Sequence, residues 1–261
     1  MELSLSGRVV ESGSNNILTV REFFELARRN GYKAVDLRAS QFSPDTSDAA
    51  FNAIKSGLSE TGLLVFEGAF NGRLDDAGEK DFIKFAKRLA DLKAQGIRMG
   101  GDLAVLKRAC ILAAPLGLKI FYQMHTGGLF ETIASTAKAI AEINEFNFAV
   151  LPEPSNLLMA REKFSADMLV PLKGRIGGIH VQTIEIHTDA QQTLKLSDGT
   201  AVNYERVDYE QNRQIDFPVF FQALRHVGFE GYINELEPCP GGEKLEDTVA
   251  KAAKFLARFI V

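Results

Sequence analysis

Short apolar stretches alternate with longer amphipathic ones along almost the whole chain, and a glycine often stands between them. The amphipathic stretch 20–27 predicts a helix that stops at Asn30-Gly31, and the apolar run 34–37 follows as a strand. The same order recurs at four later glycines, each directly before a short apolar run: Gly62, Gly96, Gly117 and Gly228. Glycine adopts the left-handed conformation that ends a helix, so these positions mark helix-to-strand turns.

Strands that alternate with helices about every 30 residues are typical of βαβ units and a parallel sheet. With residues 3–10 as the first strand and 176–184 as the seventh, the pattern predicts about eight strands and about eight helices. Eight strands close a barrel, whereas about six would leave an open doubly wound sheet. No G-x-G-x-x-G motif follows the first strand. We therefore predict an α/β protein with a single (β/α)8 TIM-barrel domain over residues 1–261.

One stretch, residues 188–213, breaks this order. Asp198-Gly199 stands between alternating residues, which predicts a hairpin insertion after strand seven. That position lies on the face where the active site of a barrel is expected. The hairpin is a candidate lid or rim, or a contact in a homo-oligomer; a surface hairpin without function is the other interpretation.

Composition and charge narrow the class of protein. The 261 residues are 46% hydrophobic with a net charge of −4, which argues against a surface that binds nucleic acid. Cys110 and Cys239 are too few for a disulfide framework, and we expect both to be reduced. The first residues do not read as a signal peptide, and no apolar run is long enough to span a membrane. We expect a cytoplasmic protein.

Four late apolar runs lead directly into side chains that can bind a metal ion or move a proton. These are Gln123 and His125, Glu153, His180 and Gln182, and Glu235 and Glu237. In a parallel barrel the carboxyl ends of all strands open on one face, so the four groups are expected to meet there. Carboxylate, imidazole and amide oxygen are ligands for a divalent cation.

Local sequence supports several of these candidates. Prolines on both sides of Glu153 hold its carboxylate on a stiff turn. His180 and Gln182 lie two residues apart on a strand and share a face, as do Glu235 and Glu237. At least one of the two late glutamates is expected to be functional, and the sequence leaves open which one.

The remaining candidates have weaker support. His125 precedes a Thr-Gly-Gly loop and could polarise a substrate oxygen or bind the metal. Glu67 could supply a further carboxylate, and Arg98 could bind an anionic or hydroxyl group of a substrate. For both of them, and for Arg38, a structural role is the preferred interpretation. Cys239 has no evident base partner, which disfavours a nucleophilic role.

Four segments together resemble the xylose-isomerase-like barrel superfamily, and the resemblance covers almost the whole chain. They are Gly31-Tyr32-Lys33-Ala34-Val35-Asp36-Leu37-Arg38, Glu153-Pro154-Ser155-Asn156, Ile179-His180-Val181-Gln182 and Gly228-Phe229-Glu230-Gly231-Tyr232-Ile233-Asn234-Glu235. The last two are similar to segments of hydroxypyruvate isomerases. The resemblance implies one divalent cation (Mn, Mg, Co or Zn) held by Gln123, Glu153, His180 or Gln182, and Glu235.

Two residues depart from the pattern that the resemblance implies. Glu153 stands where the family usually has Asp, which keeps the charge and lengthens the reach. Gln123 stands where a Glu is expected, and its neutral amide cannot act as a base. A two-carboxylate epimerase mechanism would then need Glu67 or Glu153 as a substitute. Placing Glu235 in the family position also requires a one-residue shift in the last strand, which leaves Glu237 open.

The resemblance and the polar tails together predict a metal-dependent isomerase or epimerase of a sugar or small hydroxy-carbonyl compound. Glu235 or Glu237 would remove a proton to give an enediolate, and His125 or His180 would stabilise the oxyanion. A lyase or dehydratase on a keto-sugar or keto-cyclitol would use the same site. A metal-poor barrel that serves as a binding or accessory subunit remains a second alternative. With only four histidines and an acidic chain, a repair-type phosphodiesterase is disfavoured.

Overall fold

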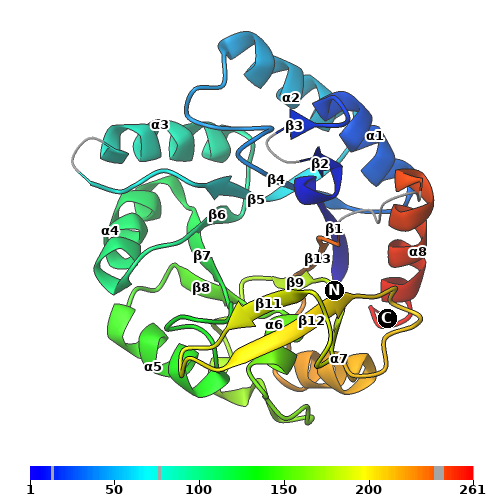
Figure 1. Cartoon of the computed structure of the whole chain (residues 1–261). Coiled ribbons are helices and arrows are strands. Elements are labelled where there is room, and N and C mark those ends of the chain that lie inside the picture. Colours follow the sequence, from blue (N-terminus) through cyan, green and yellow to red (C-terminus); the bar gives the residue numbers. More distant parts are fainter. Residues whose placement is uncertain (13–14, 76–77, 238–243, 261) are drawn as a thin grey trace.

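Eight parallel strands form the centre of the structure, a computed structural model that describes residues 1–12, 15–75, 78–237 and 244–260. Their order is β8-β7-β6-β5-β4-β1-β13-β9, and the helices lie outside them (Figure 1). The strands are β1 (Glu2–Ser6), β4 (Ala34–Leu37), β5 (Leu64–Phe70), β6 (Gly96–Met99), β7 (Lys119–Gln123), β8 (Phe148–Leu151), β9 (Ile179–Val181) and β13 (Tyr232–Glu235).

The ends of this sheet meet through the segment that precedes β9. The amide of Val150 in β8 donates to the carbonyl of Arg175 at 2.8 Å, and the amide of Gly177 donates to the carbonyl of Val150 at 2.9 Å. These bonds join the first and last strands of the sheet order, so the parallel strands surround a central lumen. The predicted TIM barrel is confirmed.

The helices cover the outside of the strands and bury their apolar faces against them. The α-helices are α1 (Val20–Arg29), α2 (Asp48–Thr61), α3 (Gly78–Asp91), α4 (Leu103–Ala113), α5 (Ile133–Ile143), α6 (Pro154–Met159), α7 (Phe217–His226) and α8 (Leu245–Ala257). Short 3-10 turns lie at η1 (Gly7–Val10), η2 (Ala114–Leu116) and η3 (Val170–Leu172). Gly62 ends α2 with φ of 69°, as the glycine pattern predicts. No helix in the described residues is both long and apolar enough to cross a membrane.

Two strands differ from their predicted bounds, and both differences shape the site. The first strand ends at Ser6 instead of continuing to residue 10, because the chain turns into η1, where the Ser6 hydroxyl accepts the amide of Arg8. A Cβ at Gly7 would overlap the side-chain amide of Gln41, so a larger residue here would have to displace Gln41. In place of one strand over 176–184, β9 is short, and Ile184 begins a strand of a second sheet.

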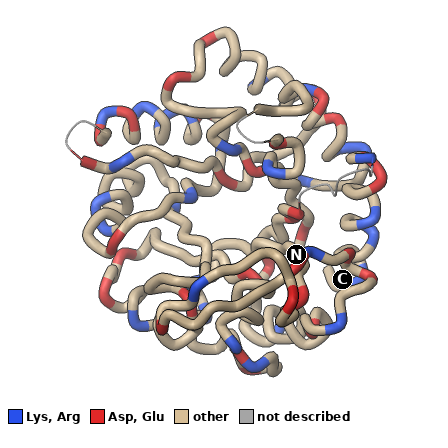
Figure 2. The backbone as a smooth tube through the Cα atoms, in the orientation of Figure 1, with Lys and Arg blue, Asp and Glu red and all other residues tan. Residues whose placement is uncertain are grey.

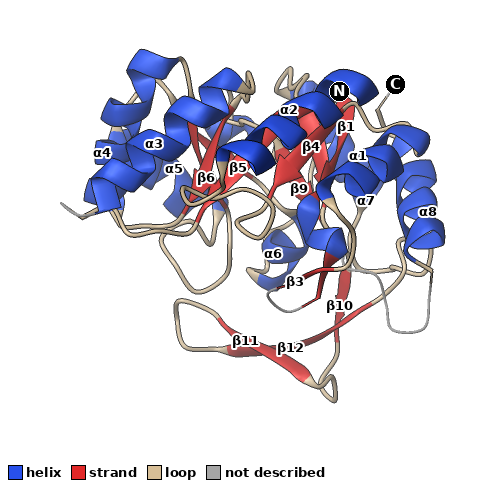
Figure 3. Ribbon diagram, turned by 90° about the horizontal axis from the view of Figure 1, so that it is seen from above, coloured by secondary structure: helices blue, strands red, loops and turns tan. Residues whose placement is uncertain are grey.

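The second sheet is antiparallel and lies beyond the carboxyl ends of the barrel strands (Figure 3). It contains β10 (Ile184–Ile186), β11 (Gln192–Lys195) and β12 (Ala201–Arg206). Strands β11 and β12 pair on either side of Asp198-Gly199, where Gly199 has φ of 85°. A two-strand pair, β2 (Glu11–Ser12) with β3 (Asn15–Asn16), also lies at this end.

The lumen is closed at its base by apolar side chains, above which polar ones begin. The base is the buried cluster of Ala34, Phe66, Phe121, Ala149, Leu151 and Tyr232. Strand β5 changes register against β4: Val35 pairs with Val65, whereas Asp36 pairs with Glu67. Phe66 is therefore the extra residue of a β-bulge, and both Phe66 and Glu67 face inwards.

The base of the barrel requires a glycine beside the Phe66 ring. A Cβ at Gly178 would overlap that ring, whereas one at the exposed Gly128 meets nothing within 4 Å. We expect Gly178→Ala to lower the free energy of unfolding by about 1–3 kcal/mol, as overpacked cores do. Gly128→Ala is the matched control and should change it by less than about 0.5 kcal/mol. Denaturant unfolding of the two variants measures the difference; equal stability would contradict the described packing.

Candidate active site

A buried carboxyl, Glu67, lies at the centre of the polar part of the lumen. Its Oε1 atom lies 2.9 Å from Nε2 of His180 and accepts the Nε hydrogen of Arg98 at 3.0 Å. Glu67 and His180 are 0% and 1% exposed, while Oε2 of Glu67 and Nδ1 of His180 have no hydrogen-bond partner among the described residues. Buried polar atoms are rarely left without a partner, so these two are candidate contacts for a substrate or an ordered water.

Burial sets the protonation of this pair. Desolvation raises the pKa of Glu67 to about 7, against the opposing effect of the Arg98 guanidinium. Desolvation and the positive charge of Arg98 lower the pKa of His180 to about 3. His180 is therefore a neutral imidazole across the physiological range, and Glu67 gains and loses its proton near neutral pH. A carboxyl with such a pKa suits general acid–base chemistry.

Glu153 lies at the N-terminus of α6, directly after β8. Its Oε1 accepts the amide of Ser155 at 2.9 Å, and its Oε2 accepts the side-chain amides of Asn156 and Gln182, the latter at 3.1 Å. The N-cap position and Pro154 at the first turn explain why the sequence holds this carboxylate in place. Burial raises its pKa to about 7, and the same hydrogen bonds oppose the rise.

Strand β9 connects the two carboxyls. His180 contacts Glu67, and Gln182, two residues further along the same face, donates to Glu153. Positions two apart on a strand are separated by about 7 Å, so the two carboxyl groups belong to one side of the lumen. His180 and Gln182 each contact a different glutamate.

Glu235 lies at the end of β13 but points toward the helix layer. It pairs in register with Leu5 and Val181, which both belong to the outer apolar core. Asn234, one residue earlier, pairs with Ser4 and His180 and faces the lumen, where its amide approaches Asp36 at 3.4 Å. Desolvation raises the pKa of the buried Glu235 to about 8. The structure therefore does not bring Glu235 to the lumen beside Glu67.

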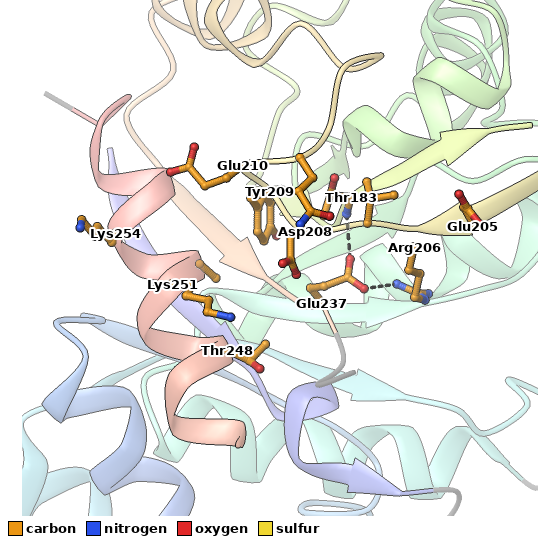
Figure 4. A pocket seen from close by; sticks show the side chains of 13 residues that line it. Thr183, Glu205, Arg206, Asp208, Tyr209, Glu210, Glu237, Thr248, Lys251 and Lys254 are labelled. Atoms are coloured by element: carbon orange, nitrogen blue, oxygen red, sulfur yellow. Dashed lines mark hydrogen bonds and ion pairs between the residues drawn. The ribbon is translucent and has the colours of Figure 1, made fainter. Parts of the chain in front are cut away.

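Glu237 follows β13 and borders a cavity of about 800 Å³ between the second sheet and α8 (Figure 4). Its Oε2 accepts the amide of Thr183 at 2.8 Å, and its Oε1 accepts Arg206 at 2.6 Å. Arg206 comes from the end of β12 and also donates to Oε1 of Gln182 at 3.2 Å. The second sheet therefore places a guanidinium group, that of Arg206, at the opening of the barrel.

Arg8 is a second guanidinium at this opening, and the sequence interpretation missed it. Its Nη1 donates to the same Gln182 Oε1 at 3.1 Å. The turn after Ser6 directs it there. A prediction that ended the first strand at Ser6, and that considered basic residues after early strands as well as metal-binding residues after late ones, would have included Arg8. Arg206 has no such signal, because only the folded hairpin brings it near β9. Acidic and basic positions both lie around the opening (Figure 2).

Gln123 and His125 remain apart from this network. His125 is exposed, and its Nδ1 lies 3.0 Å from the neighbouring Thr126 carbonyl. Among the described residues, no hydrogen bond joins Gln123 or His125 to Glu67, Glu153 or His180. Cys110 is buried in α4 with its thiol free, whereas Cys239 lies outside the described residues.

The predicted set of metal ligands does not fit this arrangement. Glu153 uses both oxygens on protein donors, Glu235 faces the helices, and His180 directs Nε2 to Glu67. Within residues 1–12, 15–75, 78–237 and 244–260, no three His, Cys, Asp or Glu side chains are placed to hold a metal ion. In their place at the opening lie two arginines around an amide oxygen.

Comparison with known proteins agrees with the fold. A family model described as "Xylose isomerase-like TIM barrel" matches residues 103–259. No curated protein matches the sequence.

Three solved structures show the extent of the similarity. A D-psicose 3-epimerase from Clostridium cellulolyticum H10, solved with D-tagatose, has a TM-score of 0.75 at 15% identity and covers 100% of this chain and 99% of its own. An IolI protein with a bound zinc atom has 0.76 at 16%, with 100% and 98% covered. A probable 3-DHS dehydratase, AsbF from Bacillus anthracis, has 0.73 at 15%, with 98% and 99% covered. At these identities the likeness establishes the fold.

Glu235 offers a test of its buried, helix-facing position. Its pKa of about 8 exceeds the ordinary glutamate value of about 4.5, so between these pH values the folded state retains a proton that the unfolded state has lost. This contribution to stability is complete below about pH 4.5 and is lost as the pH rises through about 8. Glu235→Gln cannot ionise, so we expect its melting temperature to exceed that of the wild type by several degrees at about pH 9 and to match it at about pH 4. Calorimetry at both pH values measures this, and a constant difference would contradict the assignment.

Proposed function

The chain belongs to the xylose isomerase-like TIM barrel family, and we propose that it is an isomerase or epimerase of a small, sugar-like hydroxy-carbonyl compound. One observation carries this proposal: two buried carboxyls with pKa values of about 7, Glu67 and Glu153, lie on one side of the lumen, joined through β9. Proton transfer next to a carbonyl needs a base and an acid that both change charge near neutral pH.

Glu67 is the proposed base. Its Oε2 is buried and free of hydrogen bonds within the described residues, whereas Oε1 is fixed by Arg98 and His180. Fixing one oxygen orients the other, which would remove the proton from the carbon beside the substrate carbonyl. Neutral His180 then holds Glu67 in place without competing for its charge.

Glu153 is the proposed second group. Its hydrogen bonds to Ser155, Asn156 and Gln182 hold the carboxyl at the end of β8, and its pKa lets it hold a proton at neutral pH. Return of a proton to the former carbonyl carbon, with the hydroxyl proton of the enediol moving to the other oxygen, would give isomerisation. Epimerisation would need a proton delivered to the opposite face of the same carbon, so two carboxyls on one side of the lumen favour isomerisation. The structures named as epimerases share this fold.

A dehydratase is the second candidate, favoured by the similarity to the AsbF structure. Removal of the same proton by Glu67, followed by proton donation from Glu153 to a β-hydroxyl, would release water and leave a double bond. The two reactions differ in product mass, because isomerisation conserves it. A barrel without catalytic activity, serving as an accessory subunit, would give neither product.

A divalent cation is expected from the sequence, and one related structure contains zinc. The donor atoms described above do not fit that expectation, so no step of the proposed reaction passes through a metal. The proton transfers require only the side chains of this chain.

Replacing either carboxyl tests the proposal. We expect Glu67→Gln and Glu153→Gln to lower kcat/KM by on the order of 10²–10⁴, the usual contribution of a general base or acid. Wild-type activity should pass through a maximum near pH 7, because Glu67 must be ionised to accept a proton and Glu153 must be protonated to donate one. Incorporation of solvent deuterium beside the carbonyl, followed by NMR across a panel of keto-sugars, detects turnover of either product class.

Glu79→Gln is the matched control, because Glu79 forms an exposed ion pair with Arg108 on α4, outside the lumen. Full activity of Glu67→Gln on a substrate that the wild type converts would remove Glu67 from the reaction. Product without deuterium would argue against carbon deprotonation as a whole.

A further inference from the structure

Two guanidinium groups converge on one neutral oxygen at the opening of the barrel. Nη1 of Arg8 and Nη1 of Arg206 donate to Oε1 of Gln182 at 3.1 and 3.2 Å. The two nitrogen atoms therefore lie within two hydrogen-bond lengths of each other. One amide oxygen accepts from two guanidinium groups, and each guanidinium carries five N–H donors, so most donors of Arg8 have no partner within the described residues.

The charges around this pair are unbalanced. Arg206 has an ion-pair partner in Glu237, at 2.6 Å. Arg8 has no carboxylate within ion-pair distance in the described part of the chain, and both Arg206 and Arg38 act against its charge. Burial adds to this effect and lowers the pKa of Arg8. Glu237 and Glu153 offset part of this repulsion from beyond ion-pair distance, whereas no negative charge in the described part of the chain is in direct contact with Arg8.

An oxyanion would supply that charge. Carboxylate and phosphate oxygens accept two parallel N–H bonds from a guanidinium, a geometry that a lysine could not match. Gln182 also ties the position to the reaction site, because its Nε2 donates to Glu153. A group bound by Arg8 and Arg206 would therefore lie next to one of the two proposed proton-transfer carboxyls.

We propose that Arg8 and Arg206 bind an anionic group of the substrate, a carboxylate or a phosphate, so that the substrate is an anionic hydroxy-carbonyl compound. This inference rests on the proposed function and names the substrate class of the same site. It also gives the second sheet a role: β12 brings Arg206 to the opening, so the hairpin residues after β9 determine specificity. The arginine pair lies in the part of the site where the sequence predicts a divalent metal ion.

Binding of simple anions tests the pair directly. The probes are inorganic phosphate, D-glycerate as a small hydroxy-carboxylate, and uncharged dihydroxyacetone, each titrated calorimetrically into the full chain in the presence of a chelator. We expect one equivalent of phosphate or of glycerate to bind, which identifies the anion, and dihydroxyacetone to bind much more weakly. Arg8→Gln and Arg206→Gln should each weaken anion binding by about tenfold or more, as the loss of a charged hydrogen bond does.

Two further variants keep the result interpretable. Arg21→Gln removes an arginine from exposed ion pairs on α1 and should leave the affinity unchanged. Arg8→Lys retains the charge but loses the paired donors, so its affinity should fall between those of the wild type and Arg8→Gln even if the latter folds poorly. Failure of both anions to bind the wild type, or equal binding by wild type and both Gln variants, would overturn the proposal.

The outcome is separable from that of the proposed function. Conversion of uncharged keto-sugars without any anion binding would retain the isomerase and discard the arginine site. Anion binding that depends on Arg8 and Arg206, with no turnover of any charged or uncharged hydroxy-carbonyl compound, would retain the site and discard the isomerase.

Discussion

The β-bulge in β5 is the constraint on which the polar lumen depends. Without the extra residue, the period-two alternation of a strand would turn Glu67 outwards with Val65 and leave only Phe66 inside. With it, Phe66 closes the base of the barrel, and Glu67 reaches His180 and Arg98 directly above that base. One inserted residue therefore lets the same strand supply both the apolar base of the barrel and the central carboxyl of the site.

Burial then sets the protonation of the carboxyl and imidazole groups of the site. Burial favours the neutral forms of Glu67 and Glu153 and raises their pKa values. Arg98 at Glu67, and the hydrogen-bond donors around Glu153, oppose this rise, so both pKa values are about 7. The same burial keeps His180 neutral, so it can hold Glu67 without an ion pair. The lumen thus contains groups that exchange protons near neutral pH, while permanent positive charge stays on arginines.

The sequence predicted the barrel well because glycine turns and apolar runs are local signals, repeated once for each βα unit. It predicted Glu153, His180 and Gln182 as site residues at strand ends; their roles stay predictions, and the structure joins His180 to Glu67 and Gln182 to Glu153. It gave Glu67 only a minor place, because a bulge leaves no mark in the alternation of residues. The sequence did not indicate Arg206 for a different reason: its partner Gln182 is 24 residues away, across a hairpin.

The register of β13 explains why the expected carboxylate pair is absent from the lumen described here. Asn234 pairs with Ser4 and His180 on the inner side, which turns Glu235 to the helices. The end of β7 likewise carries Gln123. The resemblance expects a carboxylate at the inner end of each of these two strands. Each strand instead places a side-chain amide there: Gln123 in β7 and Asn234 in β13. The titrating carboxyls come instead from β5 and the end of β8, next to an arginine pair, which matches proton transfer on a substrate that brings its own negative charge.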